Sequence, residues 1–107
     1  MRLGDLQRVF GRLVPRLIDK AHELGYEVVL GDAHRSIEEA RRLGFENSNH
    51  TRCLAIDLNL FRCGVYLTET EDHRELGEWW EKQHPEARWG GRFNDGNHYS
   101  FNWKGTA

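Results

Sequence analysis

The 107-residue sequence has few cysteines, few prolines and no long apolar run. A membrane-spanning helix needs about 20 consecutive apolar residues, so no membrane insertion is expected. The N-terminus also lacks the charged, then apolar, then small pattern of a signal peptide, and we expect a protein that is made in the cytoplasm. Cys53 and Cys63 are the only cysteines. Without an export signal they are expected as reduced thiols, although their short separation leaves a disulfide between them open.

An excess of positive charge is missing as well. The chain carries 15 basic and 17 acidic residues, a formal net charge of -2, and the two signs are well mixed. No extended basic surface is available to neutralise phosphates, which argues against nucleic acid or an anionic membrane as partner. The twelve aromatic residues are enough for one core, and the length suits one domain over residues 1–107. A monomer is the simplest expectation.

The first part of the chain predicts one long amphipathic helix. Apolar residues recur with helical spacing over residues 3–24, which is about six turns. Pro15 lies inside this stretch and cannot donate to the carbonyl of Gly11, so a kink or break is expected there. Gly25 supplies a stop signal.

Two further helices and four strands complete the expected fold. A short strand is predicted over residues 26–30 and a helix capped by Ser36 over residues 37–43. A third helix, capped by Thr70 or Asp72, is predicted to run to His84. Strict alternation of apolar and polar residues predicts a strand at 54–61, and the next residues turn into a second strand to make a hairpin. A glycine-rich loop then leads to a last strand at 98–103. This order indicates an α+β domain with a mainly antiparallel sheet and flanking helices.

Six histidines are more than average for this length. His22, His73 and His84 fall on predicted helices among charged residues, where surface positions are expected. The other three fall in loops or at strand ends, where functional sites are commonly built. These three are His34, His50 and His98.

The strongest local pattern joins His50 to Asp57, which points from the polar face of a predicted strand. Seven residues separate them, so a continuous strand would place them on opposite faces, whereas a turn at residues 51–53 would let them converge. Histidine nitrogen and aspartate oxygen are suitable zinc ligands, and His98 would be the third, leaving the fourth tetrahedral position for water. Taken singly, each residue has a simpler interpretation, Asp57 facing solvent and His50 an ordinary loop residue.

Two charged residues could serve such a site. Asp95 lies three residues before His98 and could take a proton from water and pass it to a leaving amine. Arg35, at the start of the second helix, could hold a substrate carboxylate or a tetrahedral oxyanion. The simpler alternatives are a plain turn around Asp95 and a surface ion pair for Arg35.

These patterns together resemble the zinc D-alanyl-D-alanine metallopeptidase family, over roughly residues 26–101. The matching elements are Ser48-x-His50-x-x-Cys53-x-Ala55-x-Asp57, then Trp89-Gly90-Gly91, then Asp95-x-x-His98. The family includes D,D-carboxypeptidases, D,D-dipeptidases and the bacteriophage endolysins that cut the L-alanyl-D-glutamate bond, and the Hedgehog signalling domain shares its fold.

The resemblance implies a role for each matched residue. His50, Asp57 and His98 would bind Zn2+, and Asp95 would be the catalytic base. Arg35 would stabilise substrate or oxyanion, and Ser48 would orient a ligand or bind substrate. The sequence departs from the family where Cys53 replaces the usual glycine, so that a residue with a side chain must make the turn or the thiol lies near the metal. A second departure is Ser100, which follows Tyr99 where many members place an acidic or amide residue.

The resemblance implies a peptidoglycan peptidase that acts on the cell-wall stem peptide after release from the cytoplasm. A phage-type L-alanyl-D-glutamate endopeptidase is favoured over a D,D-carboxypeptidase, because the latter would normally need an export signal. A catalytically inactive metal-binding module and a metal-dependent nuclease are the rival interpretations; the presence of Asp95 disfavours the first and the absence of a basic surface the second. The sequence leaves the bond that is cut and the native metal open.

Overall fold

A five-stranded antiparallel sheet forms the centre of the computed structural model, which describes residues 1–107. The strands run in the order β1-β2-β5-β4, and β3 pairs with β2 beside this path. All pairings are antiparallel, as the predicted α+β class requires. The strands are β1 (Glu27–Leu30), β2 (Ala55–Arg62), β3 (Val65–Tyr66), β4 (Ala87–Trp89) and β5 (His98–Phe101).

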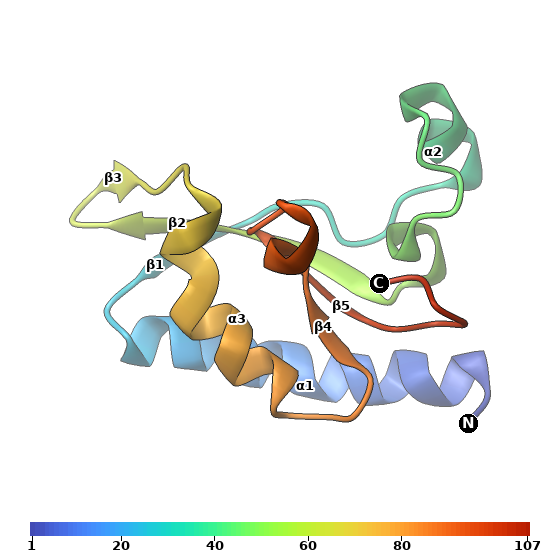
Figure 1. Ribbon diagram of the computed structural model, residues 1–107, viewed down its shortest axis with the longest axis horizontal. Helices are drawn as coiled ribbons and strands as arrows, with labels where there is room; N and C mark the ends of the chain where they lie inside the picture. The colour runs from blue at the N-terminus through green and yellow to red at the C-terminus, as the bar shows by residue number, and fades with distance from the viewer.

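The first helix, α1 (Leu3–Glu23), lies along one face of the sheet (Figure 1). Its apolar stripe is buried there, as the periodicity predicts. The helix runs through Pro15 without interruption, so the expected break is absent. Pro15 and Gly11 both lie on the exposed face, where water can bond to the carbonyl that the proline leaves free. The buried stripe consists of Leu6, Phe10, Leu13, Leu17 and Ala21.

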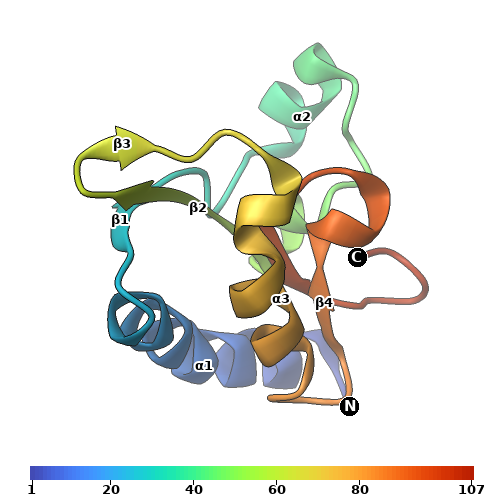
Figure 2. The same ribbon diagram turned by 60° about the vertical axis from the view of Figure 1, so that its left-hand side comes forward.

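Aromatic side chains fill the core between α1, the sheet and α3 (Arg74–Glu81). The ring of Phe10 meets Trp80 and Phe101 edge-on, at centroid distances of 5.8 and 5.3 Å. Trp89 of β4 lies flat against Gly77 of α3, where an added Cβ would come within 2.2 Å of the indole. Figure 2 shows how α1 and α3 flank the sheet. No helix is both long enough and apolar enough to cross a membrane.

Several predicted boundaries differ in the structure. The helix expected from Thr70 or Asp72 to His84 is split into a 3-10 turn, η2 (Thr70–His73), and α3, which ends at Glu81. The expected glycine-rich loop begins with strand β4 and continues as a 3-10 turn, η3 (Gly90–Phe93). The last strand ends at Phe101. By contrast, α2 (Ile37–Leu43) is confirmed, with Ser36 Oγ accepting a hydrogen bond from the Glu39 amide at 3.0 Å.

Candidate metal centre

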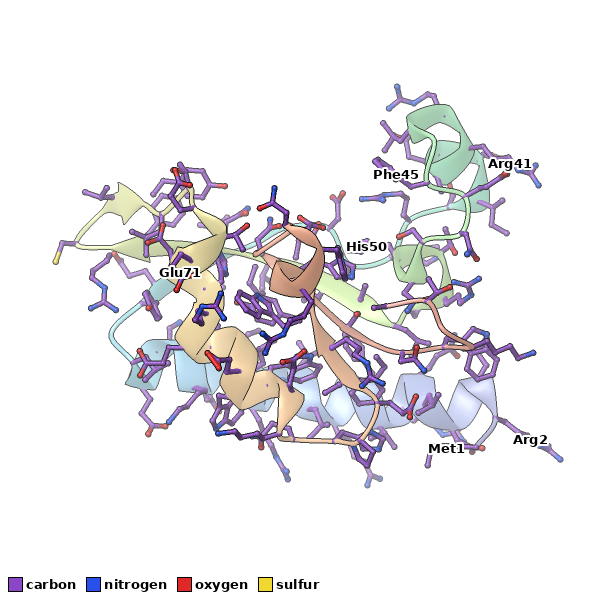
Figure 3. All side chains as sticks on the ribbon, viewed as in Figure 1. Met1, Arg2, Arg41, Phe45, His50 and Glu71 are labelled. Carbon is purple, nitrogen blue, oxygen red and sulfur yellow. The ribbon has the colours of Figure 1, made fainter.

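Strands β2 and β5 place Asp57 and His98 side by side. The two residues are paired across the strands, in register. Their neighbours Ile56, Leu58 and Tyr99 are buried in the core, so the alternation of side chains turns Asp57 and His98 to the opposite face of the sheet. The buried stripe of α1 packs on the core face, so Asp57 and His98 lie on the face that α1 does not cover. Figure 3 shows His50 on this side of the sheet, away from α1.

A 3-10 turn, η1 (Asn49–Arg52), brings His50 to the same place. Ser48 caps the turn, because its Oγ accepts a hydrogen bond from the His50 amide at 3.2 Å. Cys53 ends the turn in the left-handed conformation, with φ at 55°. The chain therefore reverses between His50 and Asp57, as the turn predicted at residues 51–53 requires, and the Cys53 thiol is exposed outside the site.

The three side chains form the one group in the molecule that is arranged to hold a metal ion. Asp57 Oδ1 lies 3.2 Å from His50 Nε2 and 3.5 Å from His98 Nδ1, and the three ligand atoms lie within 4.8 Å of one another. Tetrahedral coordination with bonds of about 2.0–2.1 Å separates neighbouring ligand atoms by about 3.3 Å, which agrees with both distances. Asp57 Oδ1 is also buried without a hydrogen-bond partner. The group therefore fits a metal ion.

The tautomer of His50 suits this role. Its Nδ1 lies 2.8 Å from the carbonyl oxygen of Ala33, which can only accept a hydrogen bond. Nδ1 must therefore carry a proton, and in the neutral ring the lone pair of Nε2 faces Asp57. A backbone carbonyl that fixes the ring of a ligand histidine in this way is common around metal sites.

The pKa values of His50 and Asp57 without a metal show that the group is suited to bind a cation. Burial alone would lower the pKa of His50, but the nearby Asp57 carboxylate and the hydrogen bond to the Ala33 carbonyl outweigh it and raise the pKa. Burial alone would raise the pKa of Asp57, but the two histidines lower it to about 2. A carboxylate that stays ionised beside two imidazoles is suited to bind a cation.

The structure places the other predicted residues around the same cleft, which has a volume of about 800 Å³. Asp95 lines one wall, with its Oδ2 3.9 Å from His98 Nδ1 and 53% of its side chain exposed. Arg35 lines the cleft as well. Its amide donates to the His50 carbonyl at 3.0 Å, and its guanidinium donates to Asp32 at 2.8 Å. Ser48 is the third predicted residue that lines the cleft, and its hydroxyl proton has no acceptor within the protein.

Some residues that build the site were not predicted. Gly31 lies against Asp57, where an added Cβ would come within 3.0 Å of the Asp57 Cβ. Its amide donates to the Asp57 carbonyl at 2.8 Å. Buried Asn49 donates to the carbonyls of Phe101 and Thr106, each at 2.7 Å, and so ties the turn that carries His50 to the end of β5. A glycine directly after a strand was the one signal for Gly31 in the sequence.

Of the histidines outside the site, one differs from the prediction in its burial. His34 is exposed and takes no part in the group. His73, expected on the surface, is buried, and its Nδ1 lies 2.7 Å from the hydroxyl of Tyr99. The prediction for His73 was wrong because the helix it was assigned to begins one residue later, and the preceding 3-10 turn points the imidazole into the core.

No protein-family model and no curated protein matches this sequence. The function therefore rests on the chemistry of the site and on the pattern of its residues.

Proposed function

We propose that this protein is a zinc-dependent peptidase that hydrolyses an amide bond in the stem peptide of bacterial peptidoglycan. The observation that carries the proposal is Asp57 Oδ1, a buried carboxylate oxygen without a hydrogen-bond partner between two imidazole nitrogens at 3.2 and 3.5 Å. An unpaired buried carboxylate oxygen is costly, and a bound cation would remove that cost.

The set of ligands favours zinc in a catalytic role. Two histidines and one aspartate are three protein ligands, and catalytic zinc sites use three where structural sites use four. Zinc bound there would act as a Lewis acid, polarising the substrate carbonyl and acidifying water. The cleft above His50, Asp57 and His98 is open to solvent and leaves room for a substrate.

Two charged side chains beside the ligands supply the remaining chemistry. Asp95 pairs with no lysine or arginine, so its carboxylate is free to accept a proton from water and to give it to the leaving amine. Arg35 holds its charge within the cleft, because only 13% of its side chain is exposed and Asp32 fixes the guanidinium. Such a fixed cation would stabilise negative charge on the substrate oxygen.

The remaining polar group of the cleft is Ser48. Its Oγ accepts from the His50 amide, which leaves the hydroxyl proton to donate to substrate. Ser48 would thus position a ligand and contact the substrate at once.

The substrate class rests on the resemblance to the D-alanyl-D-alanine metallopeptidases, whose Hedgehog-like fold we propose for this chain. All the matched residues that were assigned roles line one cleft, which supports the resemblance. We favour cleavage of the L-alanyl-D-glutamate bond by an endopeptidase of the phage type, with D,D-carboxypeptidase activity as the alternative.

The test is release of amino groups from purified peptidoglycan by the metal-free protein, with and without added zinc. Asp95→Asn should lower the rate by about 10²- to 10⁴-fold, the usual contribution of a general base, while zinc content stays stoichiometric. Asp19→Asn, which removes an exposed carboxylate of α1, is the matched control and should change nothing. The masses of the fragments identify the bond. Zinc binding without any release would instead favour the inactive metal-binding module.

A further inference from the structure

A second, smaller hollow adjoins the metal cleft. Its volume is about 190 Å³, and it lies between η2 and the loop that precedes β5. Asn94 and Asp95 line both hollows, so Asp95 stands at their junction. Gly96 and Thr70 form part of the wall and pack closely together. A Cβ added at Gly96 would come within 2.6 Å of the Thr70 Cα. A substrate held at the metal ligands could therefore extend a side chain past Asp95 into this second hollow.

The charges around the second hollow have one sign. Glu69 and Asp95 are the charged residues that line it, and no lysine or arginine does. Glu69 forms no ion pair in the structure, and Asp95 has only His98 nearby, at 3.9 Å. Two carboxylates without a counter-charge favour a cationic group between them.

His73 provides an independent sign of a ligand. Its side chain is 3% exposed and lines the hollow. On its inner edge, Nδ1 lies 2.7 Å from the hydroxyl of Tyr99, which is fully buried and has no other partner. Tyr99 must therefore donate to Nδ1, so that the proton of His73 is on Nε2. No hydrogen bond from that N–H to the protein is present, and His73 lines the hollow.

The ring of His73 does not oppose a cation. Burial lowers the pKa of His73 to about 4, so the imidazole is neutral at neutral pH. It offers a hydrogen-bond donor without adding positive charge to the hollow.

We infer that the second hollow, which adjoins the metal cleft, is a subsite for an amine-bearing side chain of the substrate. The inference rests on the proposed peptidase function. Glu69 is the residue that sets the preference for an amine, and His73 Nε2 donates to a carbonyl oxygen of the same substrate residue. The substrate would then be held at both ends, by Arg35 in the metal cleft and by Glu69 beyond Asp95.

The experiment compares two peptides that differ only in one amino group, L-alanyl-γ-D-glutamyl-L-lysine and the same peptide with norleucine in place of lysine. The L-alanyl-D-glutamate amide is N-methylated so that neither peptide is cut. Each is titrated into the zinc-loaded protein, and the amide chemical shifts of Thr70, Gly96 and Asn97 report binding in the second hollow. The lysine peptide should bind about two- to fivefold more tightly, as one partly exposed ion pair supplies.

Glu69→Gln should remove this preference by weakening the lysine peptide and leaving the norleucine peptide unchanged. Glu38→Gln, an exposed acid of α2 outside both hollows, should keep the preference. Equal affinity for the two peptides, or a preference that survives Glu69→Gln, overturns the subsite. The titration needs no turnover, so its result is separate from that of peptidoglycan release. Release with no lysine preference overturns the subsite alone, and lysine preference with no release overturns the peptidase.

Discussion

Asp57 Oδ1 and His50 Nε2 lie 3.2 Å apart, although they are seven residues apart in the chain. The 3-10 turn that carries His50 and the left-handed residue Cys53 make this approach possible. Because the oxygen is buried and makes no hydrogen bond, a bound cation would supply the partner that it lacks. The stability of the protein should therefore depend on metal.

Zinc should stabilise the wild-type protein and fail to stabilise Asp57→Asn. A ligand at 100 times its Kd adds about 2.7 kcal/mol to the free energy of unfolding. For a domain of this size that corresponds to an increase in Tm of about 10 °C or more. Asp57→Asn removes the anionic ligand, and its zinc affinity should fall by more than about 100-fold, since even an outer partner of a metal ligand contributes 10- to 100-fold.

Chelator competition gives the affinity of each variant, and thermal unfolding gives its Tm. His34→Asn is the control, because His34 is an exposed loop histidine outside the metal group. Equal zinc affinity in Asp57→Asn and in wild type would show that the three residues do not hold the ion.

Gly31→Ala should weaken zinc binding without changing any ligand. The new Cβ would come within 3.0 Å of the Asp57 Cβ and 3.1 Å of its carbonyl oxygen, so β1 and β2 must separate locally and Asp57 must move. We expect a loss of about 1–3 kcal/mol in stability, as for other overpacked positions. Zinc affinity should fall by about tenfold, as when a partner that orients a ligand is lost.

The matched control is Gly11→Ala in α1. Nothing lies within 4 Å of a Cβ added at Gly11, and alanine is the better helix former, so this variant should gain about 0.5–1 kcal/mol. If Gly31→Ala bound zinc as tightly as Gly11→Ala does, the close contact between Gly31 and Asp57 would have no part in the site.

Cys53→Gly should leave zinc affinity unchanged and make the protein more stable. Cys53 has a φ of 55°, which costs an L-residue about 1–2 kcal/mol. Glycine avoids this cost but loses more entropy on folding, so the net gain should be up to about 1 kcal/mol. Cys53→Ser retains the Cβ and removes the thiol, and should change neither quantity. Chemical denaturation and chelator competition measure the two; a loss of zinc affinity in Cys53→Ser would mean that the thiol contributes to the site.

Local patterns were sufficient to predict the elements that hold the candidate metal ligands. Alternation in β2 placed Asp57 on the polar face, and the odd separation from His50 required a turn, which the structure supplies at Cys53. The left-handed conformation of Cys53 also explains why a glycine would suit this position. These features depend on residues that are close together in the chain, which is why they could be predicted from the sequence.

Features that depend on distant contacts could not be predicted in this way. His73 was expected on the surface because its neighbours in sequence are charged, but Tyr99 and the core of the sheet bury it. Trp89 was assigned to a loop because two glycines follow it, whereas pairing with Tyr99 makes it a strand residue. Both outcomes depend on contacts with Tyr99 of β5, which follows Trp89 by 10 residues and His73 by 26.

The burial of His73 predicts a loss of stability in mild acid. The pKa of His73 falls from an ordinary value of 6.5 to about 4 in the folded protein, because burial penalises the charged ring. Between these values the unfolded chain binds a proton that the folded chain does not. Stability therefore falls as pH decreases from about 6.5 to 4, by about 3 kcal/mol in total from this residue.

Two groups of the metal site titrate as well, and a chelator keeps them metal-free in this experiment. Asp57 has a lowered pKa, so its contribution is present above its ordinary value of 3.8 and is lost as pH falls towards about 2. His50 has a raised pKa, so its contribution is present below 6.5 and is lost as pH rises through its folded-state value. The Asp57 contribution to stability changes only below the pH range in which His73 titrates. The His50 contribution decreases as pH rises, whereas the His73 contribution increases.

The contribution of His73 is isolated by comparing wild type with His73→Asn, which keeps an acceptor for the Tyr99 hydroxyl near the position of Nδ1. Contributions from His50 and Asp57 cancel in the difference between the two proteins. Urea denaturation at several pH values should show that wild type loses about 3 kcal/mol more than His73→Asn between pH 6.5 and 4. His22→Asn, at an exposed position of α1, should follow wild type. Parallel curves for all three proteins would mean that His73 is protonated in the folded state and that Tyr99 does not hold it as the neutral ring.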